Sequence, residues 1–317
     1  MAEPERDVRF LADQVYSHAG GSGRLADLYI PAAASARVPV VLWLHGGGWR
    51  FGDRRLVPDL GKFAQRSGLA VVSIDYRLSG EAKFPAPVED VKTAVRWVRS
   101  VAGEFGLDGD GIGLWGSSAG GHLASCAALS KESEFRGDEH SEYSSAVQAV
   151  VDGYGPTNFG RIDADRATMP AVGTDTESLA IGRVLPAEDP DSFESRLLGT
   201  PVGCSPREVE LADPAHYVHG ESPPFLILHG KADTLIPFQQ SQYLFNALSD
   251  SGNDVTLVLF ENLKHGFFNN HNLARETYGI VTIFRSTRHA SRVAWDCNPD
   301  EDIPSMVSGF FRAHLAR

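Results

Sequence analysis

The stretch from Gly111 to Ser130, GIGLWGSSAGGHLASCAALS, decides the fold of this chain. Its short apolar run, 112–115, predicts a buried strand, and the residues after the glycines have helical periodicity, with Leu123 and Ala127 on one face. In this setting the G-x-S-x-G pattern presents a reactive serine, because the sharp turn between strand and helix pushes the central hydroxyl out at the edge of the sheet. The stretch therefore predicts that Ser118 is a nucleophile.

The G-x-S-x-G pattern on its own is weak evidence. Glycine and serine are common in this chain, so the pattern can arise by chance, and a glycine-rich turn with an inert serine is the alternative interpretation. The strand expected before the turn and the helix expected after it favour the nucleophile. The rest of the chain has to supply the remaining evidence.

Apolar runs and helical patterns alternate along most of the chain. The runs are continuous, as in parallel strands covered on both faces, and the segments between them carry apolar residues at three- and four-residue steps. Strands are expected at 8–16, 24–30, 40–44, 69–75, 112–115, 147–152, 225–228 and 255–260. Helices are expected at 56–68, 88–105, 238–250 and 304–315, besides the one after Ser118. This alternation predicts an α/β fold with a mostly parallel sheet and helices on both faces.

Two segments interrupt the alternation. Residues 157–216 are rich in proline, glycine and charged residues and contain no long apolar run. Because a connection of that length inside a compact domain is usually functional, we expect a lid-like insertion over the site, with helices near 176–185 and 191–198. Residues 269–302 show no clear period, and we expect a second, irregular excursion there. The chain, 1–317, is otherwise expected to form a single domain.

Composition and charge limit the class of protein. The chain has 317 residues, a formal charge of −12 and 42% hydrophobic residues. The negative charge argues against nucleic acid or an anionic membrane as a partner, since both are polyanions. Residues 1–10 lack the apolar core of a signal peptide, and no apolar run is long enough to cross a bilayer. We therefore expect a cytoplasmic protein with no membrane or nucleic-acid partner; homo-oligomerisation is left open.

The cysteines indicate neither a disulfide framework nor a metal site. Cys126, Cys204 and Cys297 are odd in number and far apart in the sequence. No Cys/His spacing typical of zinc occurs. We accordingly expect no metal in the site.

Two strand-end loops supply partners for the serine. A hydroxyl nucleophile needs a base to take its proton and a carboxylate to orient that base. The carboxyl ends of parallel strands meet at one edge of the sheet, where the serine turn also lies. Asp233 follows the strand 225–228, and His265 follows the strand 255–260. The chain order Ser118, Asp233, His265 is the order expected for hydrolases with a nucleophile elbow.

Other carboxylates and histidines are weaker candidates. Asp152 precedes the insertion, and Glu261 is too close in sequence to His265 to reach the far side of its ring. His122 lies within the expected helix and His45 in a glycine run, where packing and loop-bracing roles are favoured. Three further histidines lack a strand-end position: His271, His289 and His314.

The glycine run HGGGW, residues 45–49, follows a buried strand and predicts an oxyanion hole. Glycine lets backbone N–H groups approach a ligand without a Cβ in the way. We expect donors from Gly47 and Gly48, joined by the amide of Ala119 directly after the serine. A phosphate-binding loop is the alternative, but neither G-x-x-x-x-G-K-[ST] nor G-x-G-x-x-G occurs in the chain.

The combined motifs resemble those of the α/β-hydrolase superfamily, and within it the hormone-sensitive-lipase-like and feruloyl-esterase-related (BD-FAE-like) carboxylesterases. The motifs are HGGGW at 45–49, GSSAGG at 116–121, HGKAD at 229–233 and KHGFF at 264–268, supported by FGD at 51–53, DYRLS at 75–79, FPAPVED at 84–90 and YGP at 154–156. The resemblance covers roughly residues 25–270 and is weakest across 157–205. It implies a mostly parallel sheet of about eight strands with a lid-like insertion. It also implies the triad Ser118, Asp233 and His265.

These observations predict a serine carboxylesterase that forms an acyl-enzyme and needs no cofactor. The resemblance implies small ester substrates, with short-chain acyl, acetyl or aromatic acyl groups. Trp49 gives the glycine run the H-G-G-x-W form of arylformamidases, so an amidase of that type is the alternative. A non-catalytic ligand-binding protein on the same scaffold is a further alternative.

Overall fold

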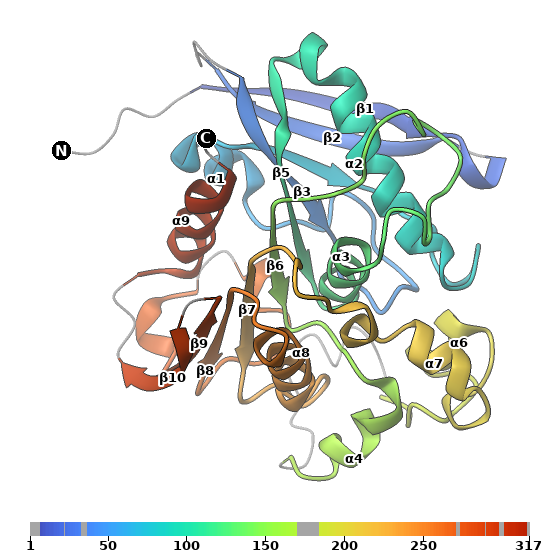
Figure 1. Cartoon of the computed structure of the whole chain (residues 1–317), viewed down its shortest axis with the longest axis vertical. Helices are drawn as coiled ribbons and strands as arrows, with labels where there is room; N and C mark the ends of the chain where they lie inside the picture. The colour runs from blue at the N-terminus through green and yellow to red at the C-terminus, as the bar shows by residue number, and fades with distance from the viewer. Residues whose placement is uncertain are drawn as a thin grey trace.

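The computed structural model of this chain describes residues 7–21, 23–32, 37–169, 184–270, 273–288, 290–297 and 301–315. One ten-stranded sheet forms its centre, with helices packed on both faces (Figure 1). The strands are β1 (Val8–Ser17), β2 (Arg24–Pro31), β3 (Val38–Leu44), β4 (Ala70–Ile74), β5 (Leu107–Ser117), β6 (Ala149–Gly153), β7 (Phe225–Gly230), β8 (Val255–Phe260), β9 (Val281–Thr287) and β10 (Ala290–Cys297). The α-helices are α1 (Leu60–Ser67), α2 (Ala86–Phe105), α3 (Ala119–Leu129), α4 (Ile162–Arg166), α6 (Phe193–Leu198), α7 (Pro206–Leu211), α8 (Gln239–Asp250) and α9 (Ile303–Leu315). The 3₁₀ turns are η1 (Ala19–Gly21), η2 (Phe159–Arg161), η3 (Val202–Cys204), η4 (Pro214–Tyr217), η5 (Phe267–Asn269) and η6 (Arg275–Thr277).

The central strands of the sheet are parallel, in the order β4-β3-β5-β6-β7-β8. Every residue of β4, β6 and β7 is buried, which explains the continuous apolar runs in the sequence. The register sets Ser117 of β5 opposite Gly153 of β6, and Gly153 opposite Leu228 of β7. The carboxyl ends of these strands therefore lie side by side, and the prediction of a mostly parallel sheet is confirmed.

The margins of the sheet are antiparallel and correct two expectations. β1 and β2, the two strands predicted near the N-terminus, form one margin, and β9 and β10 form the other. The sheet thus has ten strands, not about eight. The prediction of an irregular excursion over 269–302 was wrong where the chain forms β9 and β10. Because β10 is an edge strand whose side chains are mostly exposed over the described positions 292–297, it carries neither a continuous apolar run nor a regular alternation.

Helices cover both faces of the sheet. One hydrophobic core packs under α2, α3 and α8, and the other under α1 and α9, which lie on the opposite side of the sheet (Figure 1). The apolar stripe predicted over 88–105 is buried in α2. The helix predicted over 56–68 begins only at Leu60, because Asp59 caps it by accepting the N–H of Lys62 at 2.9 Å.

The described parts of the segment 157–216, residues 157–169 and 184–216, contain short helices and turns, namely η2, α4, α6, η3, α7 and η4. The helix predicted near 191–198 is confirmed as α6, capped by the Ser192 hydroxyl, which accepts the N–H of Ser195 at 3.0 Å. The predicted helix near 176–185 lies almost entirely outside the described residues.

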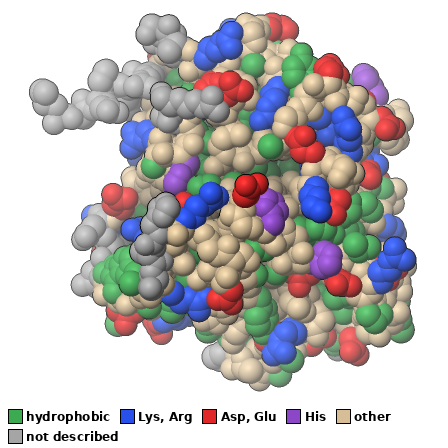
Figure 2. Space-filling view, viewed as in Figure 1, with side chains coloured by type: hydrophobic (Ala, Val, Ile, Leu, Met, Phe, Trp, Pro, Cys, Tyr) green, Lys and Arg blue, Asp and Glu red, His purple; other side chains and the backbone are tan. Residues whose placement is uncertain are grey.

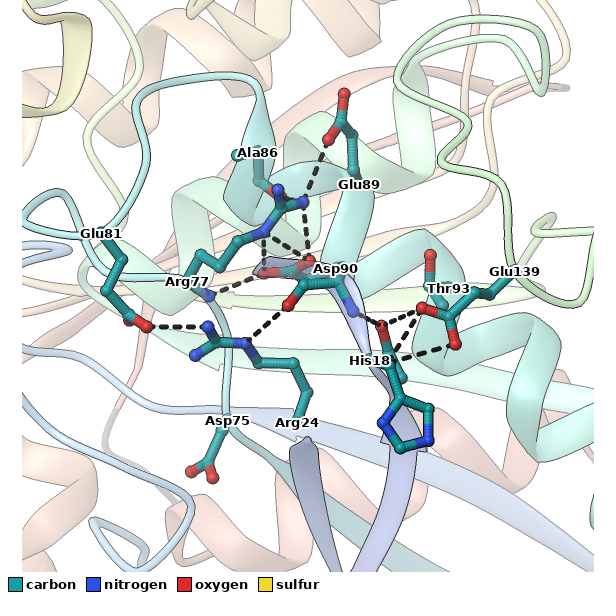
Figure 3. A network of polar contacts seen from close by, with 12 residues as sticks. His18, Arg24, Asp75, Arg77, Glu81, Ala86, Glu89, Asp90, Thr93 and Glu139 are labelled. Carbon is teal, nitrogen blue, oxygen red and sulfur yellow. Dashed lines mark hydrogen bonds and ion pairs between the residues drawn. The ribbon is translucent and has the colours of Figure 1, made fainter. Parts of the chain in front are cut away.

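A polar network ties the end of β4 to the start of α2 (Figure 3). The backbone N–H and the Nε of Arg77 donate to Asp90 at 2.7 and 2.9 Å, and Arg77 also donates to the carbonyl of Ala86 at 2.9 Å. Arg24 of β2 pairs with Glu81 at 2.7 Å in the same network. The DYRLS and FPAPVED motifs thus hold the fold together at this point.

Acidic and basic side chains are interspersed on the face of the molecule shown in Figure 2. The net negative charge is therefore not gathered into one patch on that face. Within the described ranges, no helix has the length and apolar character needed to cross a membrane.

Candidate active site

Ser118 stands at a sharp turn between β5 and α3. Its φ of 52° lies in the left-handed region that non-glycine residues rarely adopt. The neighbouring glycines make the turn feasible: a Cβ at Gly116 would lie 2.1 Å from the carbonyl oxygen of Gly120, and one at Gly120 would lie 2.0 Å from that of Leu44. The glycines of the G-x-S-x-G pattern are therefore required by sterics.

Three distant segments meet at this turn. The Ser118 hydroxyl donates to Nε2 of His265 at 2.9 Å, and Nδ1 of His265 donates to Oδ2 of Asp233 at 2.6 Å. The direction of the second bond follows because an ionised carboxylate can only accept. The structure thus brings together the serine, histidine and aspartate that the sequence predicted, in hydrogen-bonding order.

Asp233 is fully buried and is surrounded by donors. Its Oδ1 accepts the backbone N–H groups of Leu235 and Ile236 at 2.9 and 2.8 Å, and His229 lies 3.3 Å from Oδ2. Burial would raise the pKa of Asp233, but the charge of His265 and the hydrogen bonds from both histidines more than offset it and hold the pKa below its usual range. Asp233 is therefore ionised and can orient the imidazole of His265.

The residues after His265 are anchored in the core of the α1 and α9 face. The ring of Phe268 packs edge-on against Trp115, with centroids 5.4 Å apart. It has room because a Cβ at Gly153 would lie 2.1 Å from that ring. The Tyr154 ring packs edge-on against His265 itself, with centroids 4.8 Å apart. Tyr154 therefore packs on the imidazole itself, while Phe268 anchors the segment that follows it.

The carboxylates that the sequence ranked lower have other partners. Asp152 accepts the Ser125 hydroxyl at 3.0 Å and the N–H of Gly155 at 2.9 Å, and burial raises its pKa to about 6. Glu261 pairs with Lys231 at 3.0 Å at the surface. Neither of these carboxylates is bonded to the histidine of the triad within the described part of the chain.

The other histidines have packing roles or lie elsewhere. Nε2 of His122 donates to the carbonyl of Ala212 at 2.7 Å, and burial lowers the pKa of this histidine to about 4. Its ring packs edge-on against Trp49, with centroids 5.1 Å apart. His314 is in α9, and His271 and His289 lie outside the described residues.

The loop after β3 is braced from behind. The Tyr76 hydroxyl donates to the carbonyl of His45 at 2.8 Å, and the two rings stack with centroids 4.2 Å apart. Arg54 then ties the far end of the loop to the sheet, since it donates to Asp27 at 2.9 Å and to Asp75 at 3.0 Å. This bracing agrees with the loop-bracing role expected for His45.

Two of the three residues expected to donate to an oxyanion, Gly48 and Ala119, line the small cavity that contains Ser118. Among the described residues, no acceptor bonds to the backbone N–H of either residue. Gly47 is not among the lining residues, and its carbonyl accepts the N–H groups of Arg50 and Phe51, which close the loop into a turn.

The described walls of this cavity enclose about 20 Å³, room for about one water molecule. Sequence reasoning missed three wall residues, Arg166, Phe193 and Glu194, all from the segment 157–216. Their only signal in the sequence was their place in the insertion. Phe193 fits against the glycine loop because Gly48 has no Cβ, which would lie 2.5 Å from the ring. Within the described ranges, no three His, Cys, Asp or Glu side chains cluster as metal ligands.

A family model described as BD-FAE matches residues 26–248, and a model of the dienelactone hydrolase family matches residues 209–296. The first match spans most of the chain. The chain belongs to the BD-FAE family. With its mostly parallel sheet and its helices on both faces, it has the α/β-hydrolase fold.

Relatives of this BD-FAE chain include esterases. Esterase LipQ of Mycobacterium tuberculosis (strain ATCC 25618 / H37Rv) is 31% identical over 78% of this chain and 55% of LipQ. The chain thus spans about half the length of the curated relatives it matches. The propionate-bound esterase Est2 of Thermogutta terrifontis is 29% identical, with a TM-score of 0.64 over 86% of this chain and 90% of Est2. A truncated carbohydrate esterase from gut microbiota, 23% identical, shares the fold with a TM-score of 0.76 and full coverage of both chains.

Proposed function

We propose that this protein is a serine carboxylesterase that hydrolyses small esters through an acyl-enzyme. The observation that carries the proposal is the hydrogen-bonded line from Ser118 through His265 to Asp233. An isolated serine hydroxyl is a poor nucleophile, and an imidazole held by an ionised carboxylate is the group that activates it. Membership of the BD-FAE family and esterase relatives such as LipQ support this proposal.

In the proposed reaction, Oγ of Ser118 attacks the ester carbonyl while Nε2 of His265 takes the hydroxyl proton. The carbonyl oxygen becomes an oxyanion, which the N–H groups of Gly48 and Ala119 stabilise. When the tetrahedral intermediate collapses, the C–O bond to the alcohol breaks and His265 gives its proton to the departing oxygen. Water then attacks the acyl-enzyme in the same way, which releases the acid and restores the serine.

The small substrate is supported by the cavity next to the serine. The described walls enclose only about 20 Å³, so the site can accommodate a short acyl group with less rearrangement than a long one would need. Est2, with propionate bound, is a relative that holds an acid of this size.

The direct test compares two neighbouring serines. Ser118→Ala is expected to lower kcat for p-nitrophenyl acetate by roughly 10⁴- to 10⁶-fold, because the variant has no nucleophile. Ser117→Ala is the matched control, since Ser117 is buried beside the nucleophile and its hydroxyl has no hydrogen-bond partner in the described structure. Undiminished turnover by the folded Ser118 variant would contradict the mechanism.

Two further measurements define the reaction. A reactive phosphonate ester is expected to label the wild type once, and peptide mass spectrometry should place the label on Ser118. Comparison of kcat/KM for acetate esters with that for N-formylkynurenine tests the arylformamidase alternative, which Trp49 in the cavity wall favours. Faster hydrolysis of the formamide would assign the protein to the amidases.

A further inference from the structure

The proposed mechanism does not use Glu194 of α6, a buried carboxylate that lines the same cavity as Ser118. Glu194 is 2% exposed. Its Oε1 lies 3.3 Å from Arg166, but its Oε2 is buried and, among the described residues, no group donates to it. A buried acceptor without a donor costs free energy comparable to a lost hydrogen bond. Native proteins keep such groups where a ligand or a functional need explains them.

Arg166 does not supply the missing donor. Its other nitrogens donate to the carbonyls of Leu235 and Leu185, at 3.0 and 3.3 Å, and to Asp163 at 3.0 Å. These contacts hold the guanidinium in place, with only Oε1 of Glu194 within its reach. Helix α6 and Arg166 therefore fix the position of Oε2. This oxygen can still accept a hydrogen bond from a ligand.

The location of Glu194 indicates where a donor would come from. Glu194 lines the same cavity as Ser118, Ala119 and Gly48. Because Glu194 and Ser118 line one cavity, a substrate held at Ser118 brings the groups next to its ester bond close to Glu194. Arg166 already gives Glu194 a positive partner, so a neutral hydroxyl matches the remaining acceptor better than an ammonium group does.

We propose that Glu194 is a specificity-determining residue that selects esters with a free hydroxyl next to the ester group. The inference rests on the proposed esterase function and names its substrate class. The hydroxyl belongs either to the alcohol part, as in a monoester of a polyol, or to the acyl part, as in an ester of a 2-hydroxy acid. In both cases its O–H donates to Oε2 of Glu194, and plain alkyl esters leave that oxygen unpaired. A site built to bond a hydroxyl strongly rejects analogues that lack it.

The experiment uses two substrate pairs, and in each pair a methyl group replaces the hydroxyl hydrogen in the second member. For the alcohol side the pair is 2-hydroxyethyl acetate and 2-methoxyethyl acetate, and for the acyl side it is ethyl glycolate and ethyl methoxyacetate. The ratio of kcat/KM within each pair is measured for the wild type and for Glu194→Gln. With glutamine, the amide oxygen faces Arg166 and the amide N–H faces the cavity, where it can donate to hydroxyl and ether oxygens alike.

The hydroxyl preference of the wild type is expected to be roughly 10- to 100-fold larger than that of Glu194→Gln in at least one pair. The pair that responds shows which side carries the hydroxyl. Glu208→Gln removes an exposed carboxylate from the same segment and should keep the wild-type ratios. Equal ratios for the wild type and Glu194→Gln in both pairs would overturn the inference.

Hydrolysis of p-nitrophenyl acetate distinguishes a failure of the role inferred for Glu194 from a failure of the proposed esterase function. If that activity depends on Ser118 and the ratios do not change, only the role of Glu194 is wrong. If it does not depend on Ser118, the esterase mechanism itself fails. Should Glu194→Gln not fold, inhibition of the wild type decides: ethylene glycol or glycolamide should inhibit more strongly than its methoxy counterpart, and equal inhibition in both pairs would contradict the proposal.

Discussion

The ends of the neighbouring strands β6 and β7 each place a fully buried carboxylate near the edge of the sheet that carries Ser118. Asp152 lies in β6 and Asp233 just beyond β7. The pKa of Asp152 is raised to about 6, whereas that of Asp233 is held below its usual range. The two sites therefore differ in the sign of the shift, although both side chains are removed from water.

The two pKa shifts differ in sign because the two carboxylates accept different numbers of hydrogen bonds. Asp152 meets one hydroxyl and one backbone N–H, which do not balance the loss of hydration. Asp233 meets two backbone N–H groups and two imidazoles, and these four groups outweigh the loss of hydration. A buried carboxylate at a strand end can therefore serve in a triad only where donors converge on it. Three predictions test this contrast.

The largest effect is expected at Asp233. An asparagine there leaves Nδ1 of His265 without an ionised acceptor and allows the wrong imidazole tautomer, so Asp233→Asn should lower kcat by about 10⁴-fold. Steady-state kinetics with p-nitrophenyl acetate would measure this loss, with a thermal melt as the test of folding. Asp152→Asn should keep most of the activity; a greater loss there than at Asp233 would reverse the assignment.

A smaller effect, on stability, is expected at Asp152. Because the folded state binds the proton of Asp152 more tightly than the unfolded state, its contribution to stability is complete below about pH 4 and is lost as the pH rises through about 6. A shift from 3.8 to about 6 corresponds to a loss on the order of 3 kcal/mol.

Asp152→Asn should remove this loss. Urea unfolding of the wild type and the variant at several pH values should show the variant gaining relative stability between pH 4 and 7. Burial also raises the pKa of Asp213 to about 6. Asp213 therefore lowers the stability of both proteins as the pH rises, and its effect cancels in the comparison. Parallel curves for the two proteins would show that Asp152 does not titrate in this range.

The smallest effect is expected at Glu261, the third carboxylate that the sequence offered. Its side chain is half exposed and pairs with Lys231 at the surface. Such pairs contribute roughly 0 to 1 kcal/mol. Glu261→Gln should therefore change both the free energy of unfolding and kcat very little, and a loss of activity close to that of Asp233→Asn would refute this ranking.

The centre of the fold could be predicted because each of its strands carries its own signal. Buried parallel strands read as continuous apolar runs, and residues after them, such as Asp233 and His265, can be placed at one edge by topology alone. The elbow at Ser118 was predictable for a steric reason, since only glycine fits at positions 116 and 120.

The margin of the sheet and the wall of the cavity could not be predicted in the same way. Trp295 in β10 is 39% exposed, so the alternation that marks a half-buried strand is weak there. Glu194 and Arg166 meet only through tertiary contacts, with no spacing or motif that links them in the sequence. The turn that the carbonyl of Gly47 closes by accepting the N–H groups of Arg50 and Phe51 also has no signal in the sequence beyond the glycine run.

Phe268 connects the catalytic base to the far side of the sheet. Its ring lies against Trp43 and Trp115, so the segment that begins at His265 is anchored in this aromatic cluster. The geometry at His265 therefore depends on the packing of the layer beneath α9. On heating, indole fluorescence and the proposed esterase turnover should be lost together, and turnover that outlasts the fluorescence change would contradict this dependence.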